Sequence, residues 1–187
     1  MKKIIAIALC LAMLLGCAAA VAETAEKQSL TIADKFTVKW LTPEGYEINV
    51  NAINEGDGNM IITLTPDENN AGKPMMTASI APNELYSEVQ RMNDLSEEDM
   101  AAIEATFREE DEVEISYMET AYGTKLLVVK ETKDGIDFVD FYTIYLGYEI
   151  ELVLTQTEEM AGTSITDEQI ATVIQFLSDM DLEPVAK

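Results

Sequence analysis

The chain has 187 residues and a formal net charge of −23, because 35 acidic residues outnumber 12 basic ones. Binding to nucleic acids or to anionic membranes needs a basic surface, so this composition argues against both. Histidine is absent and the two cysteines, Cys10 and Cys17, lie near the N-terminus. Beyond that region, Ser-His-Asp and Cys-His catalysis and zinc or copper sites built on His and Cys are therefore excluded.

Residues 1–22 have the three-part plan of an export signal. Lys2 and Lys3 form a positive start, residues 4–16 are uncharged and apolar, and a run of small residues ends at Ala22. The apolar run is short for a membrane span, which needs about 20 residues. We therefore expect an extracytoplasmic protein.

Two kinds of processing compete at this signal. The small residues 20–22 (Ala-Val-Ala) suit a general signal peptidase, which would release the chain after Ala22. Residues 14–17 (Leu-Leu-Gly-Cys) resemble the lipobox of bacterial lipoproteins, in which Cys17 would carry the lipid. Leu15 is large for its place in that motif, which favours release. The protein would accordingly be secreted, or else held at the outer face of the cell membrane. A lipid on Cys17 is the only membrane attachment that we expect.

The segment after the signal predicts a polar tether over residues 23–33 and a single domain over residues 34–184. Apolar and polar residues alternate over 36–40 and 46–52, which is typical of half-buried strands. A Gly/Asn/Asp-rich loop over 54–59 predicts a turn, and residues 60–65 and 75–81 predict two further strands.

The middle of the chain changes to a helical period. Leu85, Val89 and Met92 have the spacing of a short helix over 83–93. Ser96 and Asp99 resemble a capping box that begins a second helix over 97–110.

Four more strands are predicted over 113–117, 125–130, 138–146 and 148–156, followed by a helix that begins at a capping box formed by Thr166 and Gln169. Pro184 ends the domain. Short, turn-like links favour antiparallel pairing, so we expect an α+β fold in which a mainly antiparallel sheet packs against two or three helices.

Residues 36–46 (FTVKWLTPEGY) resemble the opening of PsbP-like domains. The resemblance continues through Gly123, residues 147–150 (Gly-Tyr-Glu-Ile) and residues 176–178 (Phe-Leu-Ser), and spans about residues 30–182. It implies an α/β sandwich and a non-catalytic binding or accessory role. No functional motif of that family is matched here, so the resemblance assigns no site residue.

Three acidic clusters are candidates for calcium, which takes six to eight oxygen ligands. Solvated loops are the favoured interpretation of all three, since runs of charge usually mark hydrated surface. The clusters are Asn54, Asp57 and Asn59; Asp67, Glu68, Asn69 and Asn70; and Glu109, Glu110, Asp111, Glu112 and Glu114.

The function expected from the sequence is that of an exported, acidic, non-enzymatic binding or accessory domain whose small ligand or protein partner is unknown. We assign no catalytic, cofactor-binding or metal-binding residue. A carboxylate-dependent hydrolase acting on an extracellular polymer stays open, because it needs only two well-placed acids. So does a calcium-stabilised surface module. Tyr142, Tyr145 and Tyr148 are candidates to line a ligand groove, although packing between strands is the commoner role of such tyrosines.

Overall fold

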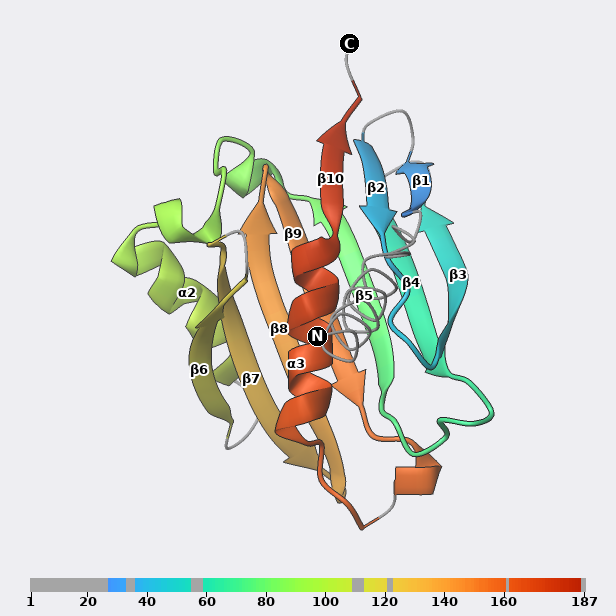
Figure 1. The fold of residues 1–187 in the computed structure, drawn as a ribbon. Coiled ribbons are helices and arrows are strands. Elements are labelled where there is room, and N and C mark those ends of the chain that lie inside the picture. Colours follow the sequence, from blue (N-terminus) through green and yellow to red (C-terminus); the bar gives the residue numbers. More distant parts are fainter. Residues whose placement is uncertain are drawn as a thin grey trace, which may run out of the picture.

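A computed structural model describes residues 27–32, 36–54, 59–108, 113–120, 123–160 and 162–185. Its largest element is an antiparallel sheet of seven strands in the order β3-β4-β5-β9-β8-β7-β6 (Figure 1). The strands are β3 (Tyr46–Asn54), β4 (Asn59–Pro66), β5 (Met75–Pro82), β6 (Glu114–Glu119), β7 (Lys125–Lys133), β8 (Ile136–Tyr145) and β9 (Tyr148–Thr155). All seven correspond to strands predicted from the sequence.

Tight turns set the register of the central hairpins. Asp134 and Gly135 join β7 to β8 with φ angles of 54° and 79°. Leu146 and Gly147 join β8 to β9 with φ angles of 52° and 78°. Positive φ at both residues is the geometry of the two-residue hairpin turn whose twist suits a sheet. The two turns place β9 at the centre of the sheet, where it also pairs with β5.

A second, three-stranded sheet has the order β1-β2-β10, with β1 (Gln28–Ile32), β2 (Phe36–Trp40) and β10 (Asp181–Pro184). Two expectations are corrected here. The tether predicted over 23–33 is wrong for residues 28–32, which form β1, and the strand over 36–40 does not join the main sheet. Strand β1 lies at the edge of its sheet and is stabilised by pairing with β2.

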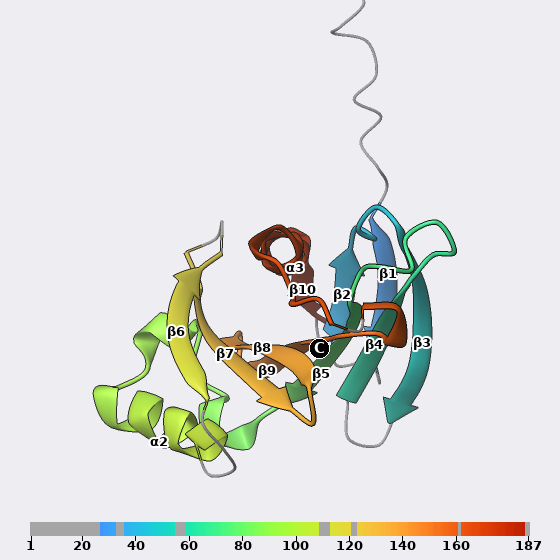
Figure 2. The ribbon, with the colours of Figure 1, turned by 90° about the horizontal axis from the view of Figure 1, so that it is seen from below.

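Two α-helices lie on opposite faces of the main sheet (Figure 2). Helix α3 (Asp167–Asp179) and the three-stranded sheet lie on one face, called here the inner face. Helix α2 (Glu97–Arg108) lies on the other, the outer face. The main sheet is therefore the middle layer, and the fold is α+β and mainly antiparallel, as expected.

The helix predicted over 83–93 is replaced by two short 3₁₀ turns, η1 (Glu84–Tyr86) and η2 (Met92–Asp94). The Asn83 side chain caps η1, and Leu85, which the helical spacing placed on a buried face, is 85% exposed. Arg91 has an extended backbone and pairs with Tyr145 of β8, which interrupts any helix at that point. Local pairing with the sheet has overridden the helical spacing.

The two faces of the main sheet carry separate cores. The inner core joins the main sheet, the three-stranded sheet and α3, and includes Phe36, Trp40, Phe141 and Phe176. The outer core lies under α2 and the 3₁₀ turns and is built from Met92, Ile103, Leu127, Val129, Tyr142 and Ile144. Within the described ranges, no helix is long and apolar enough to cross a membrane.

Candidate functional site

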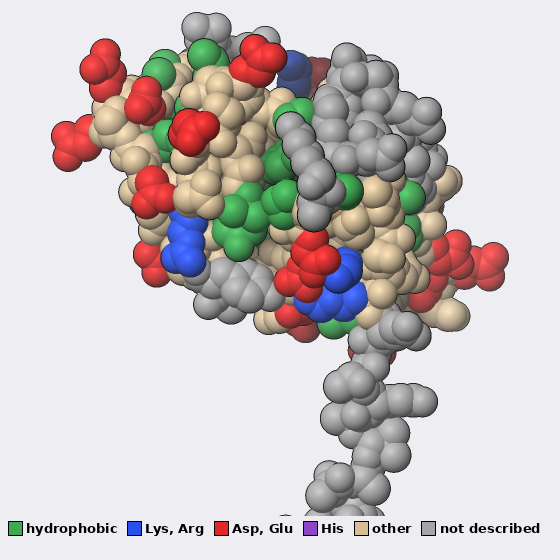
Figure 3. All heavy atoms as spheres, turned by 90° about the horizontal axis from the view of Figure 1, so that it is seen from above, with side chains coloured by type: hydrophobic (Ala, Val, Ile, Leu, Met, Phe, Trp, Pro, Cys, Tyr) green, Lys and Arg blue, Asp and Glu red, His purple; other side chains and the backbone are tan. Residues whose placement is uncertain are grey.

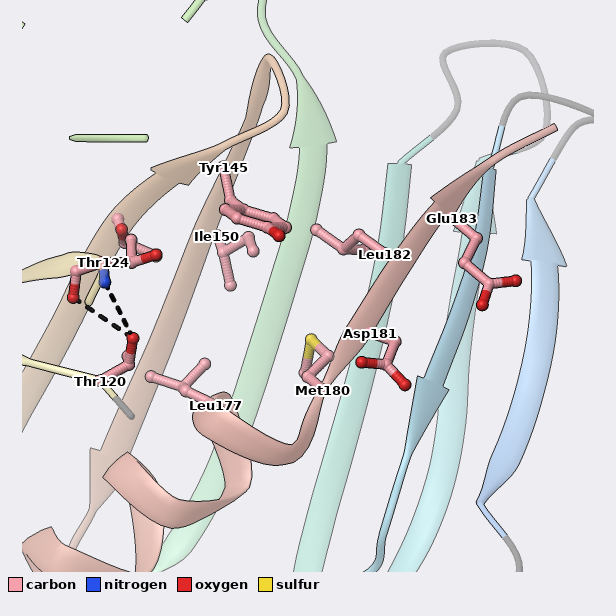
Figure 4. A pocket seen from close by; sticks show the side chains of 10 residues that line it. Thr120, Thr124, Tyr145, Ile150, Leu177, Met180, Asp181, Leu182 and Glu183 are labelled. Atoms are coloured by element: carbon pink, nitrogen blue, oxygen red, sulfur yellow. Dashed lines mark hydrogen bonds between the residues drawn. The ribbon is translucent and has the colours of Figure 1, made fainter. Parts of the chain in front are cut away.

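A cavity of about 280 Å³ opens on the inner face, where α3 ends and β10 begins; it is called here the inner pocket. Figure 4 shows its lining, which comes from the main sheet on one side and from the α3–β10 junction on the other. The lining residues are Thr120, Thr124, Thr143, Tyr145, Ile150, Leu177, Met180, Asp181, Leu182 and Glu183.

One wall of the inner pocket is apolar. Ile150 belongs to β9, while Leu177, Met180 and Leu182 come from the end of α3 and the start of β10, and all four are at least nine-tenths buried. The aromatic ring of Tyr145 lies beside Ile150 and Leu182 in Figure 4. This wall offers an apolar ligand contact without rearrangement of the chain.

Three buried threonines, Thr120, Thr124 and Thr143, add polar groups beside the apolar wall, and Thr143 pairs directly with Ile150 across β8 and β9. The Thr120 hydroxyl accepts from the Thr124 backbone N–H at 3.1 Å, as drawn in Figure 4. The Thr143 hydroxyl donates to the Lys125 carbonyl at 2.8 Å. Because these hydroxyls are held by the backbone, they form a fixed polar edge beside the apolar wall.

Ion pairs hold the charged rim of the inner pocket. Lys27 Nζ lies 2.8 Å from Asp181 Oδ2 and also donates to the Asp179 carbonyl at the end of α3. Lys39 Nζ lies 2.7 Å from Glu183 Oε2. Figure 3 views the molecule from this end and shows an apolar area bordered by acidic and basic side chains. The rim carboxylates are thus partly neutralised, which suits a ligand without a strong positive charge.

A second cavity, of about 250 Å³, lies on the outer face between α2, η1 and strands β8 and β9; it is called here the outer pocket. Its character differs from that of the inner pocket, because aromatic rings and carboxylates predominate. The lining residues are Tyr86, Ala102, Ile103, Thr106, Phe107, Tyr142, Glu149 and Glu151.

The negative charges of the carboxylates on the outer face are poorly balanced by positive charges. The Tyr142 hydroxyl donates to Glu149 Oε1 at 2.5 Å. Burial and the negative charge of Glu149 raise the pKa of Glu151. Burial, together with the charges of Glu151 and Glu131, raises the pKa of Asp140 to about 7. Both effects disfavour the ionised form, so this surface would gain from a positive charge.

The tyrosines predicted to line one groove are divided between the two faces. Tyr142 lies in the outer pocket and Tyr145 in the inner one. Tyr148 packs against Phe36 with ring centroids 4.4 Å apart. Side chains alternate along a strand, so residues three apart, such as Tyr142 and Tyr145, face opposite sides of the sheet.

Asp57 of the first acidic cluster and residues 109–112 of the third lie outside the part of the chain that the structure describes. In the second cluster, Asp67 accepts from the backbone of Asn69 at 2.9 Å and from the side chain of Asn70 at 2.7 Å, which stabilises a turn. Among the described residues, no three Asp or Glu side chains are grouped so as to hold a metal ion.

Apart from Tyr145, no residue that lines the inner pocket was predicted from the sequence to contact a ligand. Its three threonines are far enough apart in the chain to show no motif, and Met180 to Leu182 follow a helix in what resembles an ordinary domain end. The polar side chains Glu149 and Glu151 alternate with Ile150 and Leu152, which marks them as sharing one face but not as lining a cavity.

Comparison with known proteins adds a likeness in fold. No protein-family model and no curated protein matches the chain. The structure is similar to the solution structure of cyanobacterial PsbP (CyanoP) from Synechocystis sp. PCC 6803, with 12% sequence identity and a TM-score of 0.41 over 84% of this chain and 93% of that one. The resemblance to PsbP-like domains thus recurs in the structure. It concerns the fold, and we transfer no residue, partner or activity from it.

Proposed function

We propose that this chain is an exported, non-enzymatic binding or accessory domain that holds a small and largely apolar ligand in the inner pocket. The observation that carries the proposal is the lining of that pocket, in which buried apolar side chains lie beside three buried threonines. A few fixed polar groups beside an apolar surface are the usual composition of a small-molecule site. The export signal expected at residues 1–22 supports a role outside the cytoplasm.

The size and charge of the inner pocket restrict its ligand. A volume of about 280 Å³ suits a small molecule. The rim carboxylates are already paired with Lys27 and Lys39, so the ligand needs no positive charge. We therefore expect an uncharged molecule with an apolar body and one hydrogen-bonding end.

The test is a fluorescence titration with the neutral apolar dye N-phenyl-1-naphthylamine. Wild-type protein should increase the emission of the dye, and Leu177→Phe, which fills the pocket, should weaken dye binding at least tenfold. Leu85→Phe adds the same ring at an exposed position and should leave binding unchanged. Met180→Phe fills the same pocket from a neighbouring position and replaces Leu177→Phe if that variant does not fold. Dye binding that both filled variants retain would place the ligand elsewhere and contradict the proposal.

A second candidate, the carboxylate-dependent hydrolase, is favoured by one observation. Glu149 and Glu151 line the same cavity, and the raised pKa of Glu151 is a property that a general acid requires. Hydrolysis of a neutral polysaccharide that disappears in Glu151→Gln would support this candidate and overturn the non-enzymatic proposal. Activity that survives the substitution would exclude Glu151 as the acid.

A further inference from the structure

We propose that the outer pocket is a binding site for a small organic ammonium ion, held by aromatic rings and by the carboxylates of Glu149 and Glu151. This site is separate from the inner pocket, because the main sheet lies between the two faces. The proposal therefore does not depend on the function proposed above.

The rings form the first part of the argument. Phe107 of α2 and Tyr142 of β8 meet with centroids 5.9 Å apart and their planes inclined by 67°. They make two walls that meet at a steep angle, and Tyr86 of η1 adds a third ring to the lining. Aromatic faces attract cations within about 6 Å of the ring centre. Several rings around one cavity are best suited to alkylated ammonium ions.

The charges form the second part. Glu149 and Glu151 lie two residues apart on β9 and therefore on the same side of the sheet, and both line the cavity. Within the described part of the chain, no Lys or Arg lines this pocket. The ion pairs of the described residues join Lys27, Lys39 and Arg108 to carboxylates that do not line it. An organic cation would supply the missing charge.

The Tyr142–Glu149 hydrogen bond links the two parts. At 2.5 Å it fixes the Glu149 carboxylate at the hydroxyl end of Tyr142, so the charge and the aromatic residue line the cavity together. A metal ion would suit the pocket less well, because calcium needs six to eight oxygen ligands and rings supply none. A cavity of about 250 Å³ is large enough for a compact alkylated ammonium group.

The experiment is isothermal titration calorimetry of the full mature chain with choline chloride. Two references are needed: sodium chloride at the same ionic strength, and 3,3-dimethyl-1-butanol, which has the shape of choline without its charge. We expect saturable binding of choline and at least tenfold weaker binding of the alcohol. Equal affinity for the alcohol would reveal an ordinary apolar pocket, and no heat beyond that of sodium chloride would mean no site. Either result overturns the proposal.

Variants locate the site. Tyr86→Leu should weaken choline binding about fivefold or more, since a desolvated cation–aromatic contact contributes about 1–2 kcal/mol. Glu151→Gln removes a negative charge from the pocket lining and should weaken choline binding by a similar factor. Glu47→Gln and Tyr117→Leu make the same changes at exposed positions outside the pocket and should leave affinity within twofold. Circular dichroism checks the fold of every variant. If the pocket variants bind as tightly as wild type, choline is held elsewhere on the acidic surface and the proposal fails. If Tyr86→Leu does not fold, Glu151→Gln decides.

Discussion

The protonation of single carboxyl groups on the outer face is coupled to folding. Asp140 lies on β8 between Val129 of β7 and Val153 of β9, and its side chain is half-buried. Its pKa rises from 3.8 to about 7 because of burial and the charges of Glu151 and Glu131. A carboxyl group whose pKa is higher in the folded state holds its proton more tightly there. It therefore makes the free energy of unfolding fall as the pH rises from about 4 to about 7.

Asp140→Asn should remove this cost. The variant should be more stable than wild type at pH 8, by on the order of 1–2 kcal/mol after allowance for partial exposure, and the difference should shrink at pH 5. Urea unfolding at both pH values measures it. Glu44→Gln makes the same change of charge at an exposed site and serves as the control. A stability difference that is equal at the two pH values would show that Asp140 does not titrate as described.

A single glycine holds the hairpin between β8 and β9 against the segment that leads to α2. Gly147 has a φ of 78°, and a Cβ atom there would lie 3.0 Å from the Ser87 carbonyl oxygen and 3.2 Å from Ser87 Cα. Its own N–H donates to the Val89 carbonyl at 2.9 Å. Both the backbone conformation and the close approach require glycine.

Gly147→Ala should cost about 1–3 kcal/mol of stability, more than Gly135→Ala. Gly135 has a similar φ of 79°, but a Cβ atom there would meet nothing within 4 Å. The comparison separates backbone strain, which both variants share, from the contact with Ser87. Thermal unfolding measures both variants, and equal losses would mean that the chain around Ser87 yields to the methyl group.

At the scale of elements, the capping box of α3 connects a local sequence motif to the inner pocket. Gln169 N–H donates to Thr166 Oγ1 at 3.3 Å, and Thr166 N–H donates to Gln169 Oε1 at 2.8 Å. These bonds satisfy backbone groups that the first helical turn leaves free. Because the other end of α3 supplies Leu177 and Met180 to the pocket, the position of the helix affects the ligand site.

Thr166→Ala should therefore lower stability by about 1 kcal/mol. Thr172→Ala lies within the same helix, where the hydroxyl bonds to the Glu168 carbonyl of the preceding turn. That change should be neutral or slightly stabilising, because alanine is the better helix former. Chemical unfolding of the two variants should give effects that differ in size or sign, and equal losses would contradict the capping role.

The elements that the sequence predicted are those whose pattern is local. Alternation, apolar runs and β-branched or aromatic residues identified every strand of the main sheet, and the pair Thr166 and Gln169 identified the start of α3. Strands β1 and β10 were missed because they are short and polar and exist through pairing with β2. The helix over 83–93 was wrong because Arg91 pairs with β8. Tyr142 and Tyr145 were candidates to line a groove and each lines a pocket, but the other lining residues were beyond prediction, since only the tertiary fold brings them together.

At the scale of the whole molecule, the main sheet separates two sites of different chemistry. The inner pocket is apolar with a neutralised rim, while the outer pocket is aromatic and negatively charged. Changes on one face should therefore leave ligand binding on the other face intact. This separation allows the two proposals to be tested on the same protein with different probes.

The net charge of −23 should make the stability of the molecule depend on salt. In the described part of the chain the ion pairs are all partly exposed, so they add little to stability. Repulsion among the acids destabilises the folded state, and salt screens it over about 10 Å at 0.1 M. Raising sodium chloride from about 20 mM to about 500 mM should thus increase the melting temperature by several degrees. This corresponds to a rise of roughly 1–3 kcal/mol in the free energy of unfolding. Potassium chloride should act equally, because screening depends on ionic strength. A larger rise with calcium at equal ionic strength would instead reveal a specific ion site, and no rise with either salt would show that repulsion is not limiting.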